Sequence, residues 1–157
     1  MQDCGVYNLN AYPVNHSHLC LECGASLSEG VYTYSIDTYS FPLCQAHQRW
    51  LDGARTTEEA IKLYFALKLS NIQAELEYND GHKTVDIAVP GKLYIEVDGP
   101  YHNDSDQALT DLLRSFYSLK DGIATVRIPN ELVNSHYEFN LILDRLVEIC
   151  TDLKKTG

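Results

Sequence analysis

The fold of this chain is decided by the stretch Ile95-Glu96-Val97-Asp98-Gly99. Side chains alternate across a strand, so Glu96 and Asp98 point to one face while the apolar residues between them point to the other. The same alternation places Asp86, between two apolar residues of the preceding strand, on one face as well. Three carboxylates on one sheet face repel one another unless a positive group lies among them. The stretch therefore predicts either a divalent cation or paired basic side chains at this face.

Around this stretch, the chain from residue 53 onward shows helical and strand periodicities in turn. A Thr-x-x-Glu capping box from Thr56 to Glu59 opens the first helix, and Asn79-Asp80-Gly81 is typical of a hairpin turn. The expected helices cover 56–70, 105–121 and 136–154, and the expected strands cover 72–78, 83–89, 92–98 and 123–128. The order αβββαβα predicts an α/β (α+β) domain with a mixed four-stranded sheet flanked by helices.

Upstream of this domain, two pairs of metal-binding side chains share one spacing. They are Cys20 with Cys23, followed by Gly24, and Cys44 with His47. Two ligands three positions apart in a tight turn can reach one ion, so two such turns supply the four tetrahedral ligands of structural zinc. A coincidental scatter or a redox-active cysteine pair is the alternative. The odd number of cysteines favours a reducing compartment, and we expect a cytoplasmic protein.

The residues between the two pairs alternate between β-branched, aromatic and polar types. In Val31-Tyr32-Thr33-Tyr34-Ser35-Ile36 this alternation predicts a short hairpin within 25–43. The N-terminal element would then resemble a zinc ribbon or treble clef. We accordingly expect two parts, a zinc-binding element over 1–52 and a second domain over 53–157.

Composition limits the function classes. The chain has 157 residues, 45% of them hydrophobic, and a formal net charge of −10. This balance is typical of a globular protein, and no apolar run approaches the length of a membrane span. The acidic charge speaks against a protein that coats nucleic acid nonspecifically, because such a protein needs a basic surface.

Several short segments of the second part occur in the order and spacing of one known family. They are Thr56-x-x-Glu59, Val85-Asp86, Ile95-Glu96-Val97-Asp98-Gly99 with His102 beyond it, Asp111-x-x-Arg114, Gly122-Ile123 with Val126-Arg127-Ile128, and Asn130-Glu131. Together they resemble the PD-(D/E)XK restriction-endonuclease-like superfamily, and within it the branch of very-short-patch-repair-like endonucleases. The resemblance implies a mixed sheet flanked by helices, catalytic Mg²⁺ or Mn²⁺, and hydrolysis of DNA phosphodiester bonds.

The resemblance also implies a role for each site residue. Asp86 and Glu96 would bind the divalent metal, Asp98 would be a further carboxylate linked to it, and His102 would move a proton. Glu59 would approach the metal from the first helix, unless it serves only as the capping-box partner.

Two further residues of the expected helix over 105–121 belong to the pattern. Asp111 and Arg114 would orient His102 or contact phosphate, although an i,i+3 ion pair explains them equally well. The chain departs from the core family pattern at Asp98, where that pattern has a lysine. This departure removes a cation that would position the attacking water.

We therefore expect a metal-dependent DNA endonuclease or nickase. The alternative is a nuclease fold without activity that recruits nucleic acid or a protein through its zinc element. DNA is the expected partner in the first case. A homodimer or a partner protein would be needed to cut both strands, because one active site cuts one strand. No membrane partner is expected.

Overall fold

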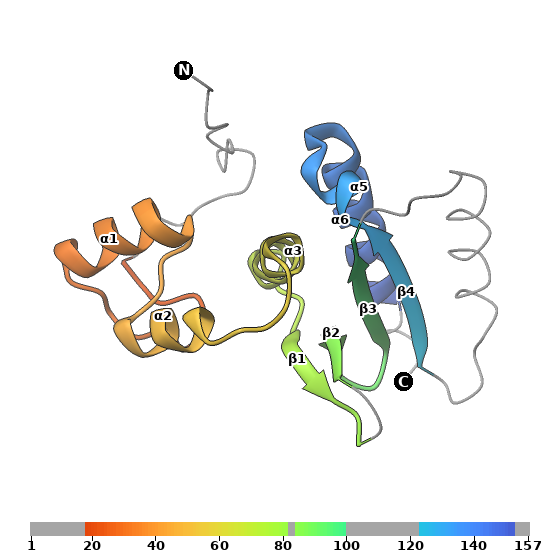
Figure 1. Ribbon diagram of the computed structural model, residues 1–157, viewed down its shortest axis with the longest axis horizontal. Helices are drawn as coiled ribbons and strands as arrows, with labels where there is room; N and C mark the ends of the chain where they lie inside the picture. Colours follow the sequence, from red (N-terminus) through yellow and green to blue (C-terminus); the bar gives the residue numbers. More distant parts are fainter. Residues whose placement is uncertain (1–17, 82–83, 100–122, 153–157) are drawn as a thin grey trace. The chain divides into compact units, whose positions relative to one another are not determined.

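The structure is a computed structural model that describes residues 18–81, 84–99 and 123–152 (Figure 1). The chain divides into two compact units, Met1–Gly53 and Ala54–Gly157. Within the described ranges, no helix is both long enough and apolar enough to cross a membrane.

From residue 18 onward, the first unit contains the helices α1 (Glu29–Tyr39) and α2 (Gln45–Asp52). The expected hairpin within 25–43 is therefore wrong, because most of that segment is α1. Ser28 caps the helix by accepting a hydrogen bond from the Val31 amide, and Ser40 ends it in the left-handed conformation. The less exposed positions are 31, 32, 35, 36 and 39, which is the spacing of a helix and not the alternation of a strand.

Ser35 joins α1 to the chain that leads into α2. Its buried hydroxyl donates to the Phe41 carbonyl at 2.7 Å and accepts from the Leu43 amide at 2.9 Å. The buried side chain of Gln48 in turn donates to the Leu43 carbonyl at 2.9 Å. A small polar group thus satisfies the backbone where the chain turns between the two helices.

The second unit contains a four-stranded sheet in the order β1-β2-β3-β4. Its strands are β1 (Glu75–Asn79), β2 (Thr84–Val89), β3 (Leu93–Asp98) and β4 (Ala124–Pro129). The first three strands pair antiparallel, and β4 pairs parallel to β3, so the sheet is mixed. The predicted fold class, a mixed α/β domain with a four-stranded mixed sheet flanked by helices, is confirmed. The helix expected over 105–121 lies outside the described residues.

In the described part of the second unit, the sheet is accompanied by the helices α3 (Glu58–Leu69), α5 (Asn130–Asn134) and α6 (His136–Asp152). α3 packs on β1, β2 and β3, α5 packs on β4, and α3 also contacts α5 and α6. The first strand was expected to begin near Ile72, but β1 begins at Glu75 and Ile72 lies in the turn that closes α3. The Ile72 amide bonds to the Leu67 carbonyl while Asn71 takes a left-handed φ of 59°, so the helix closes with a Schellman motif.

Strands β3 and β4 have one buried and one partly exposed face, whereas β1 has no buried residue and β2 is also buried at Ala88. The alternation is clearest in β3, where every second residue from Leu93 is buried. The buried face is apolar throughout and includes Val85, Ile87, Leu93, Ile95, Val97, Val126 and Ile128. The opposite face carries the carboxylates of β2 and β3, as the alternation predicted.

Candidate metal centres

Cys20, Cys23, Cys44 and His47 lie together in the first unit. One ligand atom from each of them falls within 4.8 Å of all the others. The Sγ of Cys20 is 3.5 Å from Nδ1 of His47, the Sγ of Cys44 is 3.1 Å from the same nitrogen, and the Sγ atoms of Cys23 and Cys44 are 4.0 Å apart. Atoms that bind one zinc tetrahedrally lie roughly 3.5–3.8 Å apart. The four side chains can therefore hold a metal ion, and their chemistry is compatible with structural zinc.

The first ligand pair sits on a tight turn. The Gly24 amide bonds to the Cys20 carbonyl, and the Cys20 amide bonds to the Ala25 carbonyl, each at 2.8 Å. Gly24 has a φ of 70°, a conformation that an L side chain rarely adopts. This turn brings the sulfurs of Cys20 and Cys23 to the same side.

The second ligand pair sits at the start of a helix. Cys44 is the N-cap of α2 and His47 follows in its first turn. Hydrogen bonds from the His47 backbone and ring, together with those to Cys20 and Cys23, outweigh the effect of desolvation and lower the pKa of Cys44 to about 6. Desolvation dominates at Cys20 and raises its pKa. A thiolate at Cys44 matches the charge state in which cysteine binds a metal.

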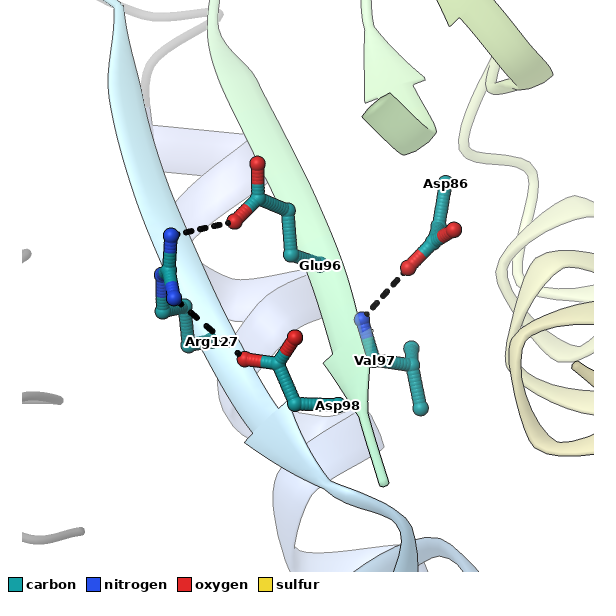
Figure 2. Close-up of polar contacts among 5 residues, drawn as sticks. All are labelled: Asp86, Glu96, Val97, Asp98 and Arg127. Atoms are coloured by element: carbon teal, nitrogen blue, oxygen red, sulfur yellow. Dashed lines mark hydrogen bonds and ion pairs between the residues drawn. The ribbon is translucent and has the colours of Figure 1, made fainter. Parts of the chain in front are cut away.

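Each of the two strands has a carboxylate one residue beyond its last paired residue, namely Asp86 on β2 and Glu96 on β3. The antiparallel ladder runs from Val89 to Ile87 on β2 and ends at the pair Ile87 and Ile95. Where the ladder ends, the carboxylate of Asp86 accepts a hydrogen bond from the Val97 amide at 2.8 Å (Figure 2). The side chain of Asp86 thus satisfies the Val97 amide just beyond the end of the ladder.

A second hydrogen bond ties Asp86 to the start of α3. The Thr56 hydroxyl donates to Oδ1 of Asp86 at 2.9 Å. The predicted capping box from Thr56 to Glu59 is therefore wrong by one residue, because the N-cap is Thr57, which accepts from the Ala60 amide. Thr56 is free of the capping role and holds the carboxylate instead.

Arg127 on β4 pairs with both carboxylates of β3. Its Nη2 lies 3.0 Å from Oε2 of Glu96, and its Nη1 lies 3.7 Å from Oδ2 of Asp98 (Figure 2). The parallel register of β3 and β4 places Arg127 directly beside Glu96. The side chains of Glu96, Asp98 and Arg127 are 15%, 32% and 46% exposed, so the guanidinium is the most accessible of the three groups. Sequence reasoning assigned no role to Arg127, although period-2 alternation already placed it on a strand face.

In the described structure, Glu59 bonds to a different partner from these carboxylates. Oε1 of Glu59 accepts a hydrogen bond from the Asn134 side chain at 2.9 Å, which ties α3 to α5. The neighbouring Lys62 donates to the Val133 carbonyl. Three predicted site residues lie outside the described residues, namely His102, Asp111 and Arg114.

Among the described residues, the group of Cys20, Cys23, Cys44 and His47 is the one place where three or more metal-binding side chains gather within ligand distance. The strand carboxylates share a sheet face without forming such a group. No family model, curated protein or solved structure matches this chain. Its similarity to the restriction-endonuclease-like superfamily therefore remains an interpretation of motif order and spacing.

Proposed function

We propose that this chain is a metal-dependent endonuclease or nickase that hydrolyses DNA phosphodiester bonds. One observation carries the proposal. Asp86 and Glu96 stand on neighbouring antiparallel strands where the ladder between them ends. Carboxylates at such a position offer hard oxygen ligands from two rigid elements to one divalent cation.

The donor set fits Mg²⁺ or Mn²⁺. Each oxygen of Asp86 has one hydrogen bond in the described structure, from Thr56 or from the Val97 amide. A carboxylate oxygen has two lone pairs, so both oxygens keep capacity for a ligand. A bound divalent cation would polarise the phosphodiester and lower the pKa of the attacking water. Asp86 and Glu96 would hold this cation. The hydrogen bonds from Thr56 and from the Val97 amide would fix the direction of the Asp86 carboxylate. His102 keeps the proton-transfer role that the resemblance implies.

Structural zinc belongs to the same proposal. Zinc would be held by Cys20, Cys23, Cys44 and His47 and would stabilise the first unit, in which few apolar side chains are buried between residues 18 and 53. The three cysteines form no disulfide. The proposal places the protein in the cytoplasm, because an odd number of cysteines is typical of a reducing compartment.

A second candidate function is a nuclease fold that binds DNA or protein without cutting. The ion pairs of Arg127 favour this alternative, because they occupy Glu96 and Asp98 with an internal cation. Asp98 in place of lysine favours it as well. The net charge of −10 makes a protein partner more compatible than bare DNA.

A plasmid-nicking assay decides between the two candidates. Supercoiled DNA is incubated with the full chain in Mg²⁺ and in Mn²⁺, beside Asp86→Asn and Glu96→Gln. Asparagine can still accept from the Val97 amide and donate to Thr56, so Asp86→Asn is expected to fold. Glu148→Gln, at an exposed glutamate of α6, is the matched control. We expect nicking by the wild type and the control and its loss in both site variants.

Two other results would count against the proposal. Nicking that survives both substitutions would show that the carboxylates are not the site. A wild-type chain that is folded, loaded with zinc and inactive on plasmid DNA of varied sequence would favour the binding module instead.

A further inference from the structure

Three cysteines meet in the metal centre of the first unit, and they differ in exposure. Cys20 is buried, with 2% of its surface accessible, whereas Cys23 is exposed and Cys44 is partly exposed. None of the three takes part in a disulfide. A small solute molecule therefore reaches Cys23 and Cys44 more readily than it reaches Cys20.

The two accessible cysteines are also close to one another. Their Sγ atoms are 4.0 Å apart, and a disulfide bond requires an approach of about 2 Å from that distance. Cys23 lies beside the turn that Gly24 closes, and Cys44 is the N-cap of α2, so neither lies within a helix or a strand. The approach therefore involves a turn and a helix cap, and no residue inside α1 or α2.

The chemistry of the pair follows from its charge state. Zinc-bound cysteine is a thiolate, and the thiolate is the form that peroxides oxidise. Hydrogen peroxide transfers one oxygen atom to the thiolate of Cys23, the more exposed of the two, which becomes a sulfenic acid while hydroxide leaves. The thiolate of Cys44 then attacks this sulfur, so that the S–S bond forms and a second hydroxide leaves. The two sulfurs are oxidised to a disulfide, and the peroxide is reduced to two hydroxide ions.

We propose that Cys23 and Cys44 are a peroxide-sensitive pair whose disulfide releases the zinc ion. The disulfide removes two of the four ligands, and Cys20 and His47 alone hold zinc weakly. It joins the turn near Cys23 to the start of α2, which are the two segments that zinc joins, so the link between them remains. The inference rests on the zinc site of the proposed function and deepens it, because it makes the occupancy of that site depend on oxidants.

Disulfide mapping on the wild type tests the pairing. The zinc-loaded full chain is treated with hydrogen peroxide, zinc release is followed with a chelating dye, and the disulfide is located by mass spectrometry of unreduced peptides. We expect Cys23 to be joined to Cys44 and zinc to be released in step with the disulfide. Zinc binding is expected to recover after treatment with a thiol reductant, because thiols exchange with accessible disulfides.

Two histidine variants identify the reactive pair. Histidine is a zinc ligand, so Cys23→His and Cys20→His each keep four ligands. Cys23→His lacks the exposed member of the pair and is expected to retain its zinc in peroxide. Cys20→His keeps the pair and is expected to release zinc as the wild type does, and so is Cys150→Ala, at a buried cysteine of α6. Zinc content and circular dichroism before oxidation show whether each variant is folded.

The outcomes separate the inference from the function on which it rests. A disulfide between Cys20 and Cys23, or one that includes Cys4 or Cys150, would overturn the pairing. Zinc that stays bound to the wild type in peroxide would overturn its release, and the zinc site of the proposed function would stand. A folded chain that binds no zinc when zinc is supplied would refute that site, and the inference with it.

Discussion

The Thr56 hydroxyl donates a hydrogen bond to Oδ1 of Asp86, across 2.9 Å and between residues 30 positions apart. It links the segment before α3 to the second strand of the sheet. The neighbouring residue makes a parallel link, since the Arg55 amide donates to the Glu77 carboxylate at 2.6 Å. The carboxylates of Glu77 and Asp86 therefore hold the segment that leads into α3.

Replacing Thr56 by valine tests this anchor. The variant keeps the shape of the side chain but removes the donor to Oδ1 of Asp86, so we expect it to lower the free energy of unfolding by about 1–2 kcal/mol. Urea unfolding followed by circular dichroism measures the change. Thr84→Val, at an exposed position of β2, is the matched control. Equal stability of Thr56→Val and the wild type would show that the hydrogen bond is not a stabilising link.

Zinc content tests the metal centre of the first unit. We expect one zinc per chain by elemental analysis, and its loss in Cys23→Ser and in His47→Ala, because three ligands bind zinc much more weakly than four. Cys150→Ala removes a buried cysteine of α6 and should leave the zinc content unchanged. A chain that retains full zinc without Cys23 would exclude this ligand set.

Tyr39 provides a pH-dependent contact in the first unit. Its hydroxyl donates to the Asp52 carboxylate at 2.8 Å, and this hydrogen bond, with desolvation, raises the pKa of Tyr39 from 10.0 to about 12. Because the folded-state value is the higher one, the contact stabilises the fold fully below pH 10 and loses its effect as pH rises through 12.

Nuclear magnetic resonance of tyrosines labelled at Cζ measures this titration directly. One resonance, assigned by Tyr39→Phe, is expected to shift about two pH units later than an exposed tyrosine. Asp52→Asn should return it to the ordinary range. Titration of Tyr39 at pH 10 in the wild type would refute the contact.

Ser35 is the buried polar centre of the first unit. Ser35→Ala leaves the Phe41 carbonyl and the Leu43 amide without their partner, so we expect a loss of about 1–3 kcal/mol in the stability of this unit. Hydrogen exchange of the amides of α1 and α2 reports the local loss. Thr33→Ala, at an exposed position of α1, serves as the control and should have little effect. Unchanged protection in Ser35→Ala would mean that water replaces the hydroxyl.

Local patterns predicted the strands well and one helix badly. The period-2 alternation of β3 required a buried and an exposed face, which the burial of alternate residues confirms. The segment of α1 carries the same residue types as a strand, and β propensity is weak compared with tertiary context. In this segment, the helical spacing of the less exposed positions indicates a helix better than the residue types do. Ser28 supplies the N-cap of that helix.

The sequence by itself determined the two cysteine-containing ligand pairs, the strand faces and the placement of Asp86 and Glu96 on adjacent strands. These features depend on spacings of two to four residues, and over such short distances the backbone geometry alone decides the direction in which each side chain points. Tertiary structure alone decided that Arg127 lies beside Glu96 and that Thr56 holds Asp86. Both contacts join residues about 30 positions apart, and only the packing of β4 and α3 against the strands brings such distant groups within hydrogen-bonding reach.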